Sequence, residues 1–197
     1  MWQSYSVELL NYWSAKMNID KAIDDLIKIE GGYVNNPKDR GGETNFGITV
    51  QTARDHGYKG AMRDLPLSVA KAIYLKTYWT GPRFDQVAKI SPGIAEELFD
   101  TGVNCGVGFA KPLLQRVLNL LNLQQKVYKD LTVDGVYGPK TLQALELTLS
   151  KRGRDGELVI LRMLNSLQGA RYIDLAEKRE SQEEFIFGWF RARVVMP

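Results

Sequence analysis

The sequence predicts an all-α, or at least strongly α-dominated, protein. Apolar residues recur at three- and four-residue spacing over most of the chain, which is the period of a helix that buries one face. Runs of β-branched residues are short and strict alternation is rare, so strands are not expected. The composition, 44% hydrophobic and 25% charged over 197 residues, is that of a globular protein with one body or two small lobes.

The first strong helical pattern covers residues 19–30. Ile19, Ala22, Ile23 and Ile27 share one face, and Asn18 precedes them as a candidate N-cap. Further helices are expected over 67–79, from Pro92 to about Thr101, and over 110–122, 139–150, 157–178 and 183–194. Between the helices 139–150 and 157–178, the basic run of Lys151, Arg152 and Arg154 is expected in a glycine-containing loop.

Residues 31–48, GGYVNNPKDRGGETNFGI, break the helical pattern with a glycine-rich stretch that has no hydrophobic period. Loops of this length within a compact domain are either functional or disordered. Tyr33, Val34, Phe46 and Ile48 can anchor the segment, so an ordered, functional loop is expected. A second turn-rich stretch, VDGVYGPKT, covers 133–141.

Composition excludes several classes of function. With one cysteine and one histidine, zinc clusters, disulfide frameworks and histidine metal sites are not expected, so neither a metal nor a cofactor is predicted. A formal charge of +3 is too small to indicate nucleic-acid binding, although it would suit an anionic polymer. No apolar run is long enough to span a membrane. The opening residues contain Glu8 and lack a basic region, so we expect synthesis in the cytoplasm without a signal peptide.

Glu30 is the strongest candidate for chemistry. It closes the first helix and is followed by Gly31 and Gly32, which suit a C-terminal cap. The helix dipole disfavours an ionised carboxylate at this end by roughly 0.3–1 kcal/mol. A carboxyl group kept protonated near neutral pH can act as a general acid. An exposed, slightly misplaced glutamate is the alternative interpretation.

Two more carboxylates follow in the glycine-rich loop, Asp39 and Glu43, and the loop can fold either of them back towards Glu30. A pair of carboxyl groups that flanks a sugar linkage is the machinery of a glycosidase. Amide and hydroxyl groups that could hold sugar hydroxyls are also present in this loop, on Asn35, Asn36, Thr44 and Asn45. Asp39 could instead serve only the turn Pro37-Lys38-Asp39-Arg40-Gly41.

The run E-G-G-Y-V-N-N-P-x-D-x-G-G-x-T-x-x-G-I-T at residues 30–49 resembles the signature of the glycoside hydrolase family 108 muramidases. The order Glu30, Asp39, Thr44 is also similar to that of other phage lysozymes, with one residue fewer before Thr44. D-T-G-V-N-C-G at 100–106 and F-x-x-G-W at 185–189 resemble later landmarks of the family. D-G-V-Y-G-P-K-T-L-Q-A-L at 134–145 is similar to the turn of peptidoglycan-binding modules.

The resemblance implies a lysozyme-like helical fold with a long Gly-rich active-site loop. It implies a catalytic region over 1–104 and a helical peptidoglycan-binding-like region over 105–197, packed together as one body. It also implies that the β-1,4 bond between N-acetylmuramic acid and N-acetylglucosamine is cut, with Glu30 as the acid and Asp39 as the second carboxylate. Candidate substrate-binding residues are Tyr33, Asn36, Thr44, Asn45, Asn104 and Trp189.

Two other functions stay open at this point. A lytic transglycosylase also uses one acidic glutamate but leaves 1,6-anhydro products, and a non-catalytic wall-binding or secretion-helper protein would release no sugar. In either enzymatic case the expected partner is the peptidoglycan glycan strand, reached in the periplasm or cell wall through a holin or after lysis. The protein is expected to act as a monomer, as an endolysin or a secreted homologue, without nucleic acid or a membrane span.

Overall fold

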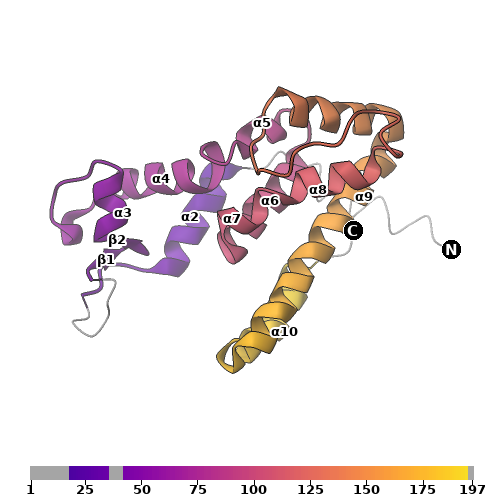
Figure 1. Ribbon diagram of the computed structural model, residues 1–197. Helices are drawn as coiled ribbons and strands as arrows, with labels where there is room; N and C mark the ends of the chain where they lie inside the picture. Colours follow the sequence, from indigo (N-terminus) through magenta and orange to yellow (C-terminus); the bar gives the residue numbers. More distant parts are fainter. Residues whose placement is uncertain (1–17, 36–41, 195–197) are drawn as a thin grey trace. The chain divides into compact units, whose positions relative to one another are not determined.

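The computed structural model describes residues 18–35 and 42–194. They form two compact units, one of Asn18–Gly81 and the other beginning at Pro82, which we call the N-terminal and C-terminal units. Helices dominate both units, and the described residues contain one two-stranded sheet (Figure 1). The predicted helix-dominated, lysozyme-like class is therefore confirmed. No helix of the described part is long and apolar enough to cross a membrane.

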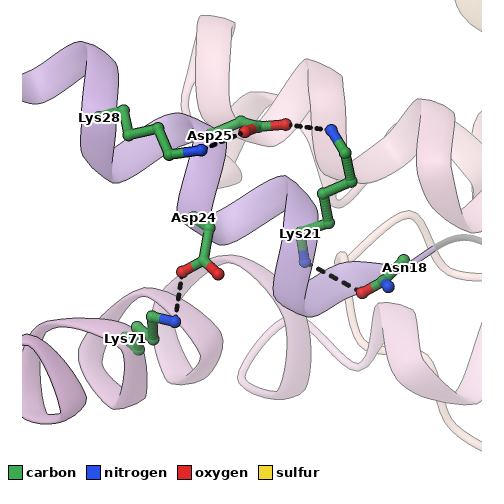
Figure 2. Close-up of polar contacts among 6 residues, drawn as sticks. All are labelled: Asn18, Lys21, Asp24, Asp25, Lys28 and Lys71. Carbon is green, nitrogen blue, oxygen red and sulfur yellow. Dashed lines mark hydrogen bonds and ion pairs between the residues drawn. The ribbon is translucent and has the colours of Figure 1, made fainter.

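The first helix of the N-terminal unit, α2 (Ile19–Glu30), matches its predicted bounds. Asn18 caps it, because the Asn18 Oδ1 accepts a hydrogen bond from the Lys21 amide at 3.0 Å. Asp25 accepts from the ammonium groups of Lys21 at 2.5 Å and Lys28 at 3.1 Å on the exposed face (Figure 2). These pairs stabilise the helix only modestly since all three side chains are solvated. The opposite face buries Ile23 and Ile27.

The second long helix of this unit is α4 (Leu67–Leu75), which packs against α2. An ion pair between Asp24 and Lys71 joins the two helices (Figure 2). Beyond Leu75 the chain widens into a π-helical turn, η2 (Lys76–Thr80), in which the Gly81 amide donates to the Lys76 carbonyl at 2.8 Å. The helix predicted over 67–79 is therefore confirmed, and its end has a π turn, a feature frequent at functional sites.

Between α2 and α4 the chain forms a small hairpin that sequence patterning did not predict. Strands β1 (Thr44–Asn45) and β2 (Ile48–Thr49) pair antiparallel, and α3 (Val50–Asp55) follows directly with Thr49 as its N-cap. A 3-10 turn, η1 (Met62–Asp64), leads to α4. Two-residue strands are too short to show alternation, which is why the segment resembled a plain loop.

The C-terminal unit is built around α6 (Pro92–Cys105), which packs against α5 (Phe84–Ala88), α7 (Val107–Ala110) and α9 (Pro139–Lys178). Ser91 caps α6 by accepting a hydrogen bond from the Ile94 amide at 3.2 Å, and Pro92 occupies its first position, as the sequence predicts. The next helix, α8 (Leu113–Leu121), buries its apolar face against α9.

The helix α9 (Pro139–Lys178) covers both predicted helices 139–150 and 157–178. The predicted loop around Lys151 and Arg152 is wrong: helix continues on both sides of a single residue, Gly153, at φ 58° and ψ −145°. A positive φ favours glycine, so a one-residue kink replaces the loop. After η3 (Glu180–Gln182), α10 (Glu183–Ala192) folds back along α9 (Figure 1).

Buried polar groups join α6 to α9. Glu97 is 3% exposed, and its carboxyl accepts a hydrogen bond from Asn165 Nδ2 at 2.8 Å. Gln168 Nε2 donates to Asp100 at 2.8 Å, and Arg193 forms an ion pair with the same carboxylate. Burial raises the pKa of Glu97 to about 8, with a further contribution from the nearby charge of Asp100.

We predict that Glu97 makes the protein less stable as the pH rises. Its pKa is about 8 in the folded state against 4.5 for a free glutamate, so the unfolded chain loses this proton at lower pH. The protonated Glu97 therefore stabilises the folded state fully below pH 4.5, and this stabilisation is lost as the pH rises through about 8. The Glu97→Gln variant should show a smaller fall in Tm between pH 5 and pH 8 than the wild type, measured by thermal denaturation. An unchanged pH dependence would contradict the prediction.

Candidate active site

Glu30 is the last residue of α2, and its side chain is exposed. Gly31 ends the helix at φ 79° and donates its amide to the Ile27 carbonyl at 3.3 Å. The positive φ agrees with the predicted glycine cap, although ψ of −166° lies outside the left-handed helical region. The chain therefore turns away immediately after the carboxyl-bearing residue and leaves that carboxyl group open to solvent.

The turn of the β1–β2 hairpin approaches this carboxyl group. Asn45 pairs with Ile48, so the turn consists of Phe46 and Gly47, at φ 52° and φ 71°. Two central residues with positive φ define a type I′ turn, which suits the twist of a hairpin. Positive φ is unfavourable for Phe46, because only glycine adopts it without strain.

Gly47 lies against Glu30 so closely that no side chain would fit. An ideal Cβ on Gly47 would lie 2.6 Å from Glu30 Oε2 and 2.8 Å from the Tyr74 hydroxyl oxygen. It would also lie 2.9 Å from the Cβ of Glu30. Real Cβ atoms do not approach heavy atoms to these distances, so the backbone of Gly47 occupies space that only glycine leaves free. Three segments, the end of α2, the hairpin turn and α4, therefore meet at one point.

Tyr74 of α4 holds the turn in place. Its side chain is 7% exposed, and its hydroxyl donates a hydrogen bond to the Phe46 carbonyl at 2.7 Å. This bond offsets the unfavourable backbone conformation of Phe46. Burial raises the pKa of the Tyr74 hydroxyl, and the negative charge of Glu30 raises it further. Tyr74 therefore stays protonated and remains a donor over the whole physiological pH range.

Tyr78 lies one turn further along, in the π turn η2. Its ring stacks on that of Tyr74 with centroids 5.8 Å apart and planes at 19°. Burial raises the pKa of Tyr78 as well, and the charge of Glu30 again contributes. The α4–η2 segment therefore carries a stacked pair of neutral tyrosines, of which Tyr74 meets Glu30 at Gly47.

The other predicted loop residues frame the hairpin. Backbone hydrogen bonds join Val34 and Thr44 in both directions at 2.9 Å. The side chain of Asn45 is 4% exposed, and its Nδ2 donates to the Met62 carbonyl at 2.8 Å. The ring of Tyr33 lies under the guanidinium of Arg63, 5.5 Å from its central carbon. Among the residues described, no hydrogen bond links Glu30 to Tyr33, Thr44 or Asn45.

The remaining predicted site residues lie elsewhere. Asn36 and Asp39 fall outside the described residues. Asn104 and Trp189 belong to the C-terminal unit. There Asn104 Nδ2 donates to the Asp100 carbonyl at 2.7 Å, and Trp189 stacks on Tyr172 with ring centroids 4.8 Å apart.

Sequence reasoning did not assign a role to Gly47, Tyr74 or Tyr78. Gly47 belongs to the glycine-rich motif, but a tight approach to another side chain cannot be read from the motif itself. The two tyrosines stand at positions i and i+4 of a predicted helix, which is the spacing of core residues. The i and i+4 spacing of the two tyrosines was the available signal in the sequence. It does not distinguish a residue of the hydrophobic core from a residue of a functional site.

Two family models match the chain. The family described as "Glycosyl hydrolase 108" matches residues 23–106, and the family described as "Predicted Peptidoglycan domain" matches residues 110–194. The structure is also similar to that of SagA from Brucella abortus, with 30% sequence identity and a TM-score of 0.57 over 91% of each chain. This chain belongs to the glycosyl hydrolase 108 family. No match was found among curated proteins.

Membership of this family, together with the peptidoglycan domain, makes the chain a peptidoglycan hydrolase of the glycosidase class. Glu30, Gly47, Tyr74 and Tyr78 all lie within the segment that the glycosyl hydrolase model matches. Within the described part of the chain, no group of three or more His, Cys, Asp and Glu side chains could hold a metal ion.

We predict that Gly47→Ala strongly lowers hydrolysis of purified sacculi. The added Cβ would displace the Glu30 carboxyl group or the Tyr74 hydroxyl, and alanine is also disfavoured at this positive φ by roughly 1 kcal/mol. Gly32→Ala is the matched control, since a Cβ there meets nothing within 4 Å. The prediction fails if both variants, folded to the same extent by circular dichroism, hydrolyse sacculi at the same rate.

Proposed function

We propose that this hydrolase is an N-acetylmuramidase that cuts the β-1,4 bond between N-acetylmuramic acid and N-acetylglucosamine. The observation that carries the proposal is the exposed Glu30 carboxyl group, held against the backbone of Gly47 beside the protonated Tyr74. A general acid must be both accessible to the substrate and fixed in position, and this arrangement supplies both properties.

In this mechanism Glu30 protonates the bridging oxygen of the glycosidic bond. The bond between that oxygen and the anomeric carbon of the muramic acid then breaks, and positive charge develops on the sugar ring. Tyr74 acts as a positioning residue through its hydrogen bond to the Phe46 carbonyl, since this bond keeps the turn against Glu30. Water completes the hydrolysis and restores the proton to the enzyme.

Asp39 is the proposed second carboxylate, which would orient this water or stabilise the positive charge at the anomeric carbon. Its position in the sequence, nine residues after Glu30 within the glycine-rich motif, supports the proposal. A separation of about 6.5–9.5 Å between the two carboxyl groups would predict inversion at the anomeric carbon, and about 5–5.5 Å would predict retention.

The biological setting that fits this activity is degradation of the bacterial cell wall, by an endolysin of a phage or prophage or by a secreted homologue. Access to the wall through a holin, or after lysis, remains a prediction of the sequence, as does a monomeric state. Substrate binding by Tyr33, Asn36, Thr44, Asn45, Asn104 and Trp189 also remains a prediction.

We predict that Glu30→Gln retains the fold and lowers hydrolysis of sacculi by about 100-fold or more, because the amide cannot donate the catalytic proton. Mass spectrometry of the soluble products should show muramic acid at the reducing end for the wild type. Glu146→Gln, an exposed carboxyl group in α9, is the matched control and should behave as the wild type.

Two results would contradict the proposal. If the wild type released 1,6-anhydro-muramyl products, the protein would be a lytic transglycosylase. If Glu30→Gln released sugars at the wild-type rate, Glu30 would not be the acid.

For Asp39 we predict that Asp39→Asn lowers the rate of hydrolysis by about 100-fold without changing the products, since the amide cannot act as a base or stabilise positive charge. Glu43→Gln, the other acidic residue of the same loop, serves as the comparison. A large loss for Glu43→Gln and none for Asp39→Asn would transfer the role of second carboxylate to Glu43.

A further inference from the structure

A cavity lies within the C-terminal unit, inside the segment matched by the peptidoglycan domain. Its volume is about 780 Å³, and its lining includes residues between Tyr128 and Val136, the N-cap Gly138, and residues of the first turns of α9 as far as Leu147. A cavity of this volume is in the range that holds small molecules or a few residues of a peptide. The family description assigns peptidoglycan to this half of the chain but names no binding residues.

The wall of the cavity is held by a buried glutamine. Gln115, 2% exposed, donates through Nε2 to Asp134 at 2.9 Å, and its Oε1 accepts from the Gly135 amide at 2.8 Å. Asp134 also accepts from the Val136 amide at 2.8 Å, and these bonds hold the pKa of its carboxyl below the usual value. The loop that carries the D-G-V-Y-G-P motif is therefore preorganised.

The two acidic groups at the cavity are exposed carboxylates that are hydrogen-bonded to neutral amides of the protein, and these bonds do not cancel their charge. Asp134 is bound by Gln115 and Val136, and Asp130 accepts from Asn122 Nδ2 at 2.6 Å. The two basic groups have no such partner. In the described structure, no hydrogen bond or ion pair involves the ammonium group of Lys129 or Lys140, and both lysines are exposed and line the cavity. Thr132 and Gln143 add a hydroxyl and an amide that are likewise exposed.

Apolar groups complete the lining. Val136 is 56% exposed and Leu147 is 39% exposed, so the cavity offers small apolar contacts beside the two ammonium groups. Tyr128 is the one aromatic residue of the lining, and its hydroxyl lies 2.8 Å from the Leu118 carbonyl. The lining therefore offers two ammonium groups without a partner among the described residues, two hydrogen-bonded carboxylates, apolar side chains and a few hydrogen-bonding groups.

The glycan strand and the stem peptide of peptidoglycan differ in their charged groups and in their apolar groups. The glycan backbone between muramic acid lactyl groups is uncharged, whereas the stem peptide carries free carboxylates and the methyl groups of alanine. Lysine ammonium groups bind carboxylates as point charges, and apolar walls accept methyl groups. The lining matches the stem peptide better than it matches the sugar chain.

We propose that this cavity binds the stem peptide of peptidoglycan, with Lys129 and Lys140 pairing with its carboxylates and with Val136 and Leu147 contacting its alanine side chains. The inference rests on the proposed function, because it assumes the same polymer as substrate. It adds a second point of attachment, separate from Glu30, through which the enzyme would stay on its polymeric substrate.

The test is co-sedimentation of the full chain with purified sacculi, in a Glu30→Gln background so that the polymer stays intact. Lys129→Ala combined with Lys140→Ala should weaken binding by about tenfold, the effect of losing two solvated ion pairs. Lys126→Ala combined with Lys151→Ala removes the same charge from exposed lysines that do not line the cavity, and should leave binding unchanged.

Two further arms identify the ligand. Sacculi stripped of stem peptides by an amidase should bind the Glu30→Gln protein about as weakly as intact sacculi bind the Lys129 and Lys140 variant. A soluble muramyl tetrapeptide should compete for binding, and an N-acetylglucosamine tetramer should not.

Equal binding to stripped and intact sacculi would overturn the proposal. An equal loss of binding in the two double variants would also overturn it, as would a failure of the tetrapeptide to compete. Sugar released into the supernatant reports separately on Glu30. Failure of the proposed catalytic role is therefore distinguishable from failure of the proposed binding site.

Discussion

Gly47 brings the backbone of the hairpin turn against the side chains of Glu30 and Tyr74, at distances where a Cβ would come within 2.6 Å of one and 2.8 Å of the other. Because the turn is this close, the end of α2, the hairpin and α4 hold one another in place. The hydrogen bond from Tyr74 to Phe46 then keeps an otherwise unfavourable backbone conformation. A carboxyl group at the exposed end of a helix would be mobile without such support, and for Glu30, the proposed general acid, the support comes from backbone and a buried tyrosine.

The segment matched by the glycosyl hydrolase family is not the same as the N-terminal compact unit. The family match extends to residue 106, whereas the compact unit ends at Gly81. Helix α6 therefore belongs to the hydrolase by sequence and to the C-terminal unit by packing. Its Glu97 is hydrogen-bonded to Asn165 of α9, so a buried polar contact joins the two family segments. The division at 1–104 and 105–197 stays a prediction.

The two halves use polar residues in different ways. Around Glu30 the carboxyl group is exposed while its neighbours Tyr74 and Gly47 are packed closely, which suits a group that must reach a substrate. Around Gln115 the polar side chains satisfy the loop backbone, and the exposed groups of the cavity include Lys129 and Lys140. Asp130 and Asp134 keep their charge while they accept hydrogen bonds from amides, so in the described structure the lysines are the charged groups of the cavity that lack a partner.

The sequence by itself determined the helical class, the bounds of α2 and the caps at Asn18 and Ser91, because these depend on local period and capping chemistry. It also made Glu30 the candidate acid, which stays a prediction. The same residues also indicated the family. Only the tertiary structure decided that Phe46 and Gly47 form a primed turn, that Tyr74 supports it and that Gly153 is a one-residue kink between two helical segments. These features depend on contacts between residues far apart in the chain, or on a single backbone angle, and neither leaves a periodic pattern in the sequence.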